Sequence, residues 1–207
     1  MEAKKTFQLV AGNSALDFVN TLDNRYTPGG PLELLTTFEE VLRFAAQAGL
    51  IGADHAGSLA RNLAGRDAER FLMEARSLRE AIAGIFYSVL EGRPALPMDM
   101  DLLGRVAGAG LAHRKLAWID GRVRWEWGEL EPITPLWMLA VTATTLLNSE
   151  EIALVRACGS PTCQWLFLDT SKNHSRRWCD MKVCGNRLKA RRFHQRVTEK
   201  MGRARSK

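Results

Sequence analysis

The chain contains 207 residues, of which 46% are hydrophobic and 25% charged, a composition typical of folded globular proteins and not of disordered ones. It has no run of about 18 apolar residues that could cross a membrane, and its first residues lack the pattern of a signal peptide. The sequence therefore argues against a membrane protein. We expect a cytoplasmic protein with one sizeable core and at most one smaller domain.

The first 112 residues carry the patterns of several helices separated by turns. Asn13 or Ser14 can cap a short helix that extends to Asn24, and the turn sequence TPGGP at residues 27–31 follows it. Capping residues and an apolar period of 3.6 residues predict further helices in four segments, namely 37–48, 55–63, 67–91 and 98–111. The last of these helices is the weakest, because three glycines interrupt it.

A hairpin and a buried helix are expected next. In the sequence KLAWIDGRVRWEWG, apolar and polar residues alternate on both sides of Asp120 and Gly121, a pair that favours a tight type I′ turn. Pro132 and Pro135 then begin an apolar helix that should be buried on most sides.

Charge is distributed unevenly along the chain. Residues 152–207 contain 14 lysines and arginines against three acidic residues, whereas residues 1–151 contain 15 against 20. The two segments thus carry +11 and −5, which together give the net charge of +6. We therefore divide the chain into two domains, 1–151 and 152–207. The basic segment suits a polyanionic partner, although it could also serve only to keep the chain soluble.

All four cysteines lie in the basic segment, and their spacing predicts a metal site. Cys158 and Cys163 form one pair with four residues between them, Cys179 and Cys184 form a second, and fifteen residues separate the pairs. Two such pairs can bring four thiolates to one Zn²⁺, which would be structural because no coordination position stays open. Two disulfides or four reduced, buried thiols are the alternative interpretation.

These elements together predict an α+β fold. We expect a mainly helical N-terminal domain with a small antiparallel sheet, followed by a small treble-clef or ribbon-like zinc finger. The aromatic residues Trp165, Phe167 and Trp178 are expected to pack around the zinc site and not to stack on bases.

Basic residues surround the expected zinc site. Eight of them are candidates for contacts with nucleic acid: Lys172, Arg176, Arg177, Arg187, Lys189, Arg191, Arg192 and Arg196. The last five belong to a predicted helix after Cys184, which has Leu188, Phe193 and Val197 available to face the zinc core. Such a helix can lie in the major groove of DNA, but basic residues with aromatic neighbours can also bind RNA.

Both ends of the chain resemble known families. Cys184-Gly185-Asn186-Arg187 is the naming motif of the CGNR zinc fingers, and the stretches CGSPTC, WLFLDTSKNHSRRWC and KARRFHQR are similar to the rest of that module. The sequence LDFVNTLDNR, residues 16–25, looks like the opening motif of the ABATE domain, which precedes this finger in bacterial stress-induced transcription regulators. The resemblance implies a zinc-dependent DNA-binding module attached to a domain that senses a small ligand.

A ligand site in the N-terminal domain is a further hypothesis. Its candidate residues are Asp17, Asn20, Asp23 and Arg25, with tryptophans of the predicted hairpin as a second wall. The same residues could instead belong to an ordinary capped helix, because polar side chains on one short helix are normal surface chemistry. The effector itself is not specified by the sequence.

We interpret the chain as a transcription regulator that binds DNA through its finger. A homodimer is compatible with this role, because proteins that recognise duplex DNA are often two-fold symmetric. Two alternatives stay open, an RNA-binding protein and a small-molecule enzyme docked through its finger. The first 151 residues contain no nucleophile elbow, phosphate loop or histidine pair, so we do not expect an enzyme.

Overall fold

The computed structural model describes residues 6–186, except for the side chain of Asn62. Its helices and helical turns are α1 (Ser14–Val19), α2 (Phe38–Gln47), α3 (Ala53–Asn62), α4 (Gly65–Leu90), α5 (Pro97–Ala112), α6 (Thr134–Leu147), η1 (Glu150–Leu154) and η2 (Met181–Gly185). Antiparallel pairs join β1 (Leu22–Asp23) to β2 (Leu32–Glu33), β3 (Arg114–Ile119) to β4 (Arg122–Trp127), and β5 (Val155–Ala157) to β6 (Leu166–Leu168). The predicted α+β class, mainly helical with small sheets, is confirmed.

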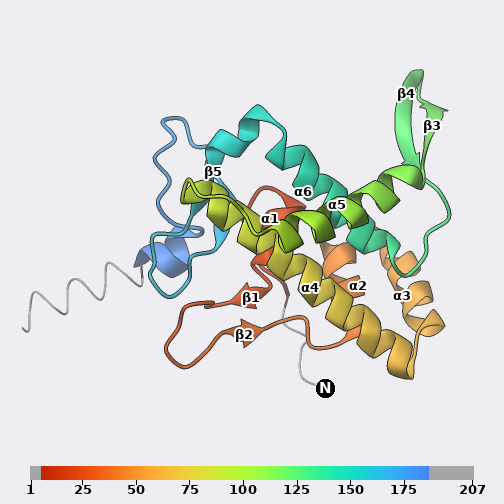
Figure 1. Ribbon diagram of the computed structural model, residues 1–207, viewed down its shortest axis with the longest axis horizontal. Helices are drawn as coiled ribbons and strands as arrows, with labels where there is room; N and C mark the ends of the chain where they lie inside the picture. Colours follow the sequence, from red (N-terminus) through yellow and green to blue (C-terminus); the bar gives the residue numbers. More distant parts are fainter. Residues whose placement is uncertain (1–5, 187–207) are drawn as a thin grey trace, which may run out of the picture.

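The core lies between the longer helices. Helix α5 packs against α4 and α6, and α1 contacts α4, α6 and strand β6 (Figure 1). Helix α6 is buried on most sides, as predicted. The buried cluster includes Phe18, Phe44 and Phe86 from the N-terminal part and also Phe167 and the four cysteines. The two parts of the chain therefore share one hydrophobic core. Within the described residues, no helix has the length and apolar character needed to cross a membrane.

The prediction that the first helix extends to Asn24 is wrong. Helix α1 begins after the N-cap Asn13 and ends at Val19. The chain then turns into β1, where Leu22 pairs with Glu33 and Asp23 with Leu32. The pairing of β1 with β2 joins segments on either side of residues 24–31. A period of 3.6 residues reports only local helical character, so it could not locate the end of α1.

Helix α5 is continuous despite its glycines, because one of them meets a closely packed neighbour. A Cβ atom on Gly110 would lie 2.8 Å from Cβ of Trp137 in α6. A side chain at this position would therefore push α5 and α6 apart. The low helix propensity of glycine is here offset by close helix packing.

The predicted hairpin, β3 and β4, is confirmed. Asp120 and Gly121 have φ values of 49° and 75°, as a type I′ turn requires. Leu116 lies opposite Trp125, and Trp118 lies opposite Val123. These four apolar side chains share one face and are 54% to 74% exposed, and the hairpin stands away from the helices (Figure 1). Trp118 and Trp125 are therefore exposed, whereas Trp127 packs against the buried cluster and borders a cavity with Asn13, the N-cap of α1.

Candidate zinc centre

The first cysteine pair lies on the turn between β5 and β6. The strand pairing continues into this turn, because the backbone N–H of Cys158 donates to the carbonyl of Trp165 at 2.8 Å. The backbone N–H of Cys163 donates to the carbonyl of Ser160 at 3.1 Å and closes the turn, which Gln164 leaves with a φ of 53°. This tight reversal brings the sulfur atoms of Cys158 and Cys163 to the same side.

The second pair is positioned by a loop and a helical turn. Cys184 lies in η2, in which the backbone N–H groups of Lys182 and Val183 donate to the carboxylate of the N-cap Asp180. A Cβ atom on Gly185 would lie 2.3 Å from Sδ of Met181 and 3.2 Å from the ring of Trp178. Glycine after Cys184 therefore lets this turn pack closely on its neighbours.

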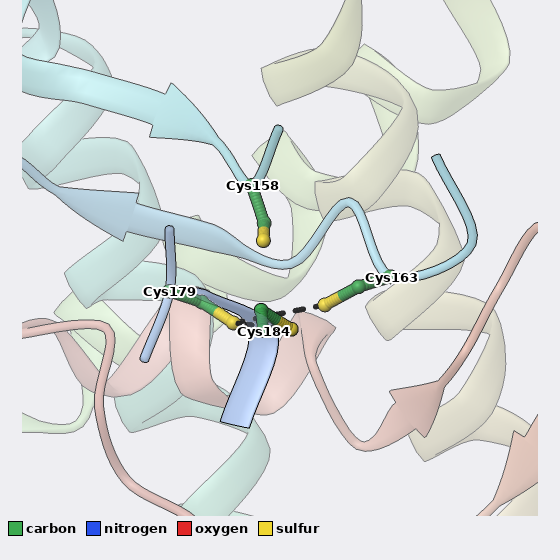
Figure 2. A group of neighbouring side chains, drawn as sticks. All are labelled: Cys158, Cys163, Cys179 and Cys184. Carbon is green, nitrogen blue, oxygen red and sulfur yellow. Dashed lines mark hydrogen bonds between the residues drawn. The ribbon is translucent and has the colours of Figure 1, made fainter. Parts of the chain in front are cut away.

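The four sulfur atoms converge on one point (Figure 2). All lie within 4.8 Å of one another, and Sγ of Cys179 is 3.6 Å from the sulfurs of both Cys163 and Cys184. Zn–S bonds of about 2.3 Å in a tetrahedron require sulfur atoms about 3.8 Å apart, whereas a disulfide requires about 2.05 Å. All four cysteines are free and buried. This geometry is that of a structural site for one zinc ion.

Hydrogen bonds between the sulfur atoms shift the pKa values of the thiols in opposite directions. The pKa of Cys158 is lowered, because the thiols of Cys163 and Cys179 donate hydrogen bonds to its sulfur. The pKa of Cys163 and that of Cys179 are raised, because each thiol donates to Cys158 and because both are buried. Without a metal ion these thiols therefore do not all ionise, and a divalent cation is needed to hold four thiolates at these distances.

Comparison with known families agrees with this geometry. The model of the CGNR zinc finger matches residues 155–197, which contain all four cysteines. The ABATE model, described as "Putative stress-induced transcription regulator", matches residues 12–150, about two thirds of the chain. The chain belongs to the ABATE family. Among curated proteins, no match was found.

Direct hydrogen bonds attach the finger to the ABATE domain. The side-chain amide of Asn20, which is 2% exposed, donates to the carbonyl of Leu166 and accepts from its N–H, both at 2.9 Å. The N–H of Leu168 donates to the carbonyl of Ala11 at 2.8 Å. The hydroxyl of Tyr87 donates to a carbonyl in the cysteine turn at 2.9 Å. The motif LDFVNTLDNR thus positions the finger through Asn20.

The predicted ligand site needs correction. The side-chain amide of Asn20 is hydrogen-bonded to the backbone of Leu166. The buried carboxylate of Asp17 accepts a hydrogen bond from the N–H of Ala11 at 3.0 Å. Arg25 forms an ion pair with Glu80. Of the four candidates, only Asp23 borders a described cavity, which lies between the ABATE domain and the finger. The walls of that cavity come from distant segments, so no local sequence signal could identify it.

The pKa of Asp17 predicts a specific pH dependence of stability. Burial raises this pKa to about 6, although hydrogen bonds from the backbone of Ala11 and Val10 oppose the shift. The folded state therefore holds a proton more tightly than the unfolded state, whose carboxyl titrates near 3.8. The contribution is fully favourable below the unfolded pKa and is lost as the pH rises through the folded pKa.

Replacement of Asp17 by Asn should remove this dependence. We expect the free energy of unfolding of Asp17→Asn, relative to the unchanged chain, to rise by roughly 1 to 1.5 kcal/mol between pH 5 and pH 7.5. Urea denaturation of both proteins at several pH values measures this difference in the free energy of unfolding. Groups other than Asp17 titrate alike in the two proteins, so their contributions cancel. A constant difference across this range would contradict the assignment.

The basic candidates divide into three groups. Lys172 and Arg177 are exposed and lie in the segment between the two cysteine pairs. Arg176 requires a correction, because its guanidinium lies over the ring of Phe167 and donates to backbone carbonyls, among them those of Val10, Trp178 and Cys179. This residue joins the finger to the N-terminal segment that contains Val10, so its guanidinium is not free for nucleic acid. The remaining candidates, Arg187, Lys189, Arg191, Arg192 and Arg196, lie outside the described residues.

Proposed function

We propose that the chain is a transcription regulator that binds DNA through its zinc finger. The observation that carries this proposal is the position of a closed four-cysteine site inside a segment with a charge of +11. Exposed Lys172 and Arg177 belong to the same segment, between the two cysteine pairs. Phosphate contacts from such residues supply much of the affinity of DNA-binding proteins.

We also propose that the chain acts without catalysis, in the cytoplasm, where bacterial DNA is found. Four thiolates fill the coordination of zinc, so the metal has no position for a substrate.

The ABATE domain would then sense a small ligand and influence the finger, to which it is joined by Asn20 and Arg176. RNA is the second polymer that the basic surface suits.

Lys172→Ala combined with Arg177→Ala should weaken binding to duplex DNA by roughly tenfold near 0.1 M salt and reduce the salt dependence of the affinity. The reason is the loss of two cations that neutralise phosphates. Fluorescence anisotropy with labelled duplexes measures both effects. Arg122→Ala combined with Arg124→Ala provides a matched control, because it removes the same charge from the distant hairpin (Figure 1).

Equal losses for both pairs of substitutions would indicate a general charge effect and contradict a DNA surface on the finger. The same titration with structured RNA and single strands separates the two polymers. Tighter binding to RNA than to duplex DNA would replace the proposed function with the RNA-binding alternative.

We propose that two copies associate through the apolar face of the hairpin. Leu116, Trp118, Val123 and Trp125 form this face, and each is more than half exposed. Together they present an apolar area on the order of 500 Å². Two copies would therefore bury about 1,000 Å², which is near the lower bound for a specific interface. A two-stranded hairpin is also only marginally stable unless another surface covers it.

Trp118→Lys combined with Trp125→Lys should convert such a dimer into a monomer. Sedimentation velocity over a range of concentrations measures the mass. Lys115→Ala, on the opposite face of the hairpin, should leave the dimer intact. A monomeric mass for the unchanged chain at all concentrations would contradict this interface.

A further inference from the structure

A cavity of about 510 Å³ lies at the base of the hairpin, where β3 begins and β4 ends. Arg114 and Trp127 contribute one wall, and residues of α6 and of the connection after it contribute a second. Asn13 and Leu50 belong to a third. No cysteine lines this cavity, so it is separate from the zinc centre. Its size is typical of sites for small molecules.

Arg114 brings an unpaired positive charge to this cavity. Its Cζ atom lies 5.4 Å from the ring centre of Trp125 and 5.5 Å from that of Trp127. These cation–π contacts hold the guanidinium in place but accept none of its hydrogen bonds. Within the described part of the chain, no group forms an ion pair or a hydrogen bond with it. Its Nε atom is buried, so a ligand would meet the two terminal nitrogen atoms.

Asn13 supplies a second donor at the same cavity. Its side-chain oxygen caps α1 by accepting hydrogen bonds from the N–H groups of Ala15 and Leu16, at 2.9 and 3.4 Å. The side-chain NH₂ group, in contrast, has no acceptor among residues 6–186. A carboxylate can accept hydrogen bonds from a guanidinium and from an amide NH₂ group together.

The rest of the lining suits the apolar part of such a ligand. Glu151 is the one acidic residue among the described residues of the lining, and it is exposed, so water screens its charge. It forms no ion pair with Arg114 in the described structure. The apolar side chains at the cavity are those of Leu50, Trp127, Met138, Val141 and Leu146.

We propose that this cavity binds a small organic carboxylate, whose negative charge pairs with Arg114 and whose apolar body lies against Trp127. Asn13 donates to the same carboxylate. Ser149 and Glu151 line the cavity and precede β5, the first strand of the finger, so the ligand contacts the connection between the two parts of the chain. Its influence on DNA binding rests on the proposed function, but its binding does not.

The acid 3-phenylpropionate is a suitable probe, and its amide, 3-phenylpropionamide, has the same shape without the charge. Calorimetric titration of the zinc-loaded chain without DNA should show one site that binds the acid about tenfold tighter than the amide. Arg114→Gln should abolish this preference, because the paired cation is lost. Thr145→Phe, at an exposed position of the lining, should weaken both ligands, because the larger side chain fills part of the cavity.

Arg122→Gln is the matched control, because it removes the same charge from the other end of the hairpin and should leave the preference unchanged. Zinc content and thermal unfolding establish that each variant is folded; if Arg114→Gln is not, Thr145→Phe decides the result. Equal affinities for acid and amide, an equal loss in Arg122→Gln, or unchanged binding by Thr145→Phe would overturn the proposal. Since the titration contains no DNA, its failure leaves DNA binding by the finger intact, and a failure to bind DNA leaves the titration interpretable.

Discussion

Cys184→Ser is expected to abolish stoichiometric zinc binding and to lower the free energy of unfolding by roughly 3 to 5 kcal/mol. For a chain of this length, that loss corresponds to about 10 °C in the unfolding temperature. The physical reason is that three remaining thiols cannot complete the tetrahedral site. The effect should extend beyond the finger, because the cysteines belong to the same buried cluster as Phe18 and Phe86.

Elemental analysis gives the number of zinc ions per chain, and calorimetry gives the unfolding temperature. Lys182→Ala is the matched control, because this exposed residue lies in the same helical turn as Cys184 and contributes no sulfur. It should keep one zinc ion and unfold within a few degrees of the unchanged chain. A Cys184→Ser chain with one zinc ion and unaltered stability would show that the cluster is not a four-thiolate zinc site.

Asn20→Ala is expected to destabilise the chain by about 2 to 4 kcal/mol, although Asn20 is not a zinc ligand. The substitution leaves both the N–H and the carbonyl of Leu166 buried without a partner. Asn20→Asp should also destabilise, because a carboxylate can accept from this N–H but cannot donate to the carbonyl. Urea denaturation of the zinc-loaded proteins measures these changes.

Asn148→Ala is a suitable control for Asn20. Its side chain is exposed and donates one hydrogen bond, to the carbonyl of Thr144 in the same helix, so its removal should cost less than about 0.5 kcal/mol. If Asn20→Ala were as mild as this control, the hydrogen bonds to Leu166 would not be what joins the finger to the ABATE domain.

The features that the sequence predicted correctly depend on local chemistry. The spacing of the cysteines within 27 residues was enough to predict the zinc site, and Asp120-Gly121 was enough to locate the hairpin turn. The apolar character of α6 likewise predicted its burial. In each case the determining residues are neighbours in the sequence, so no knowledge of tertiary contacts was required.

The features that the sequence did not predict depend on contacts between distant segments. Asn20 meets Leu166 across 146 positions, and Arg176 meets Val10 across 166. Polar residues at such positions look like surface or binding residues until their partners are known. The interdomain cavity was missed for the same reason, because Asp23 and Trp165 approach it from different parts of the chain.

Duplex binding is expected to depend on zinc, because the metal gives the finger the shape that presents its basic residues to DNA. Anisotropy would be measured on the loaded chain, after removal of zinc with a chelator, and during stepwise return of the metal. We expect affinity to disappear with the metal and to recover fully at one zinc ion per chain. Unchanged duplex binding by the zinc-free chain would show that zinc does not shape the DNA-binding surface.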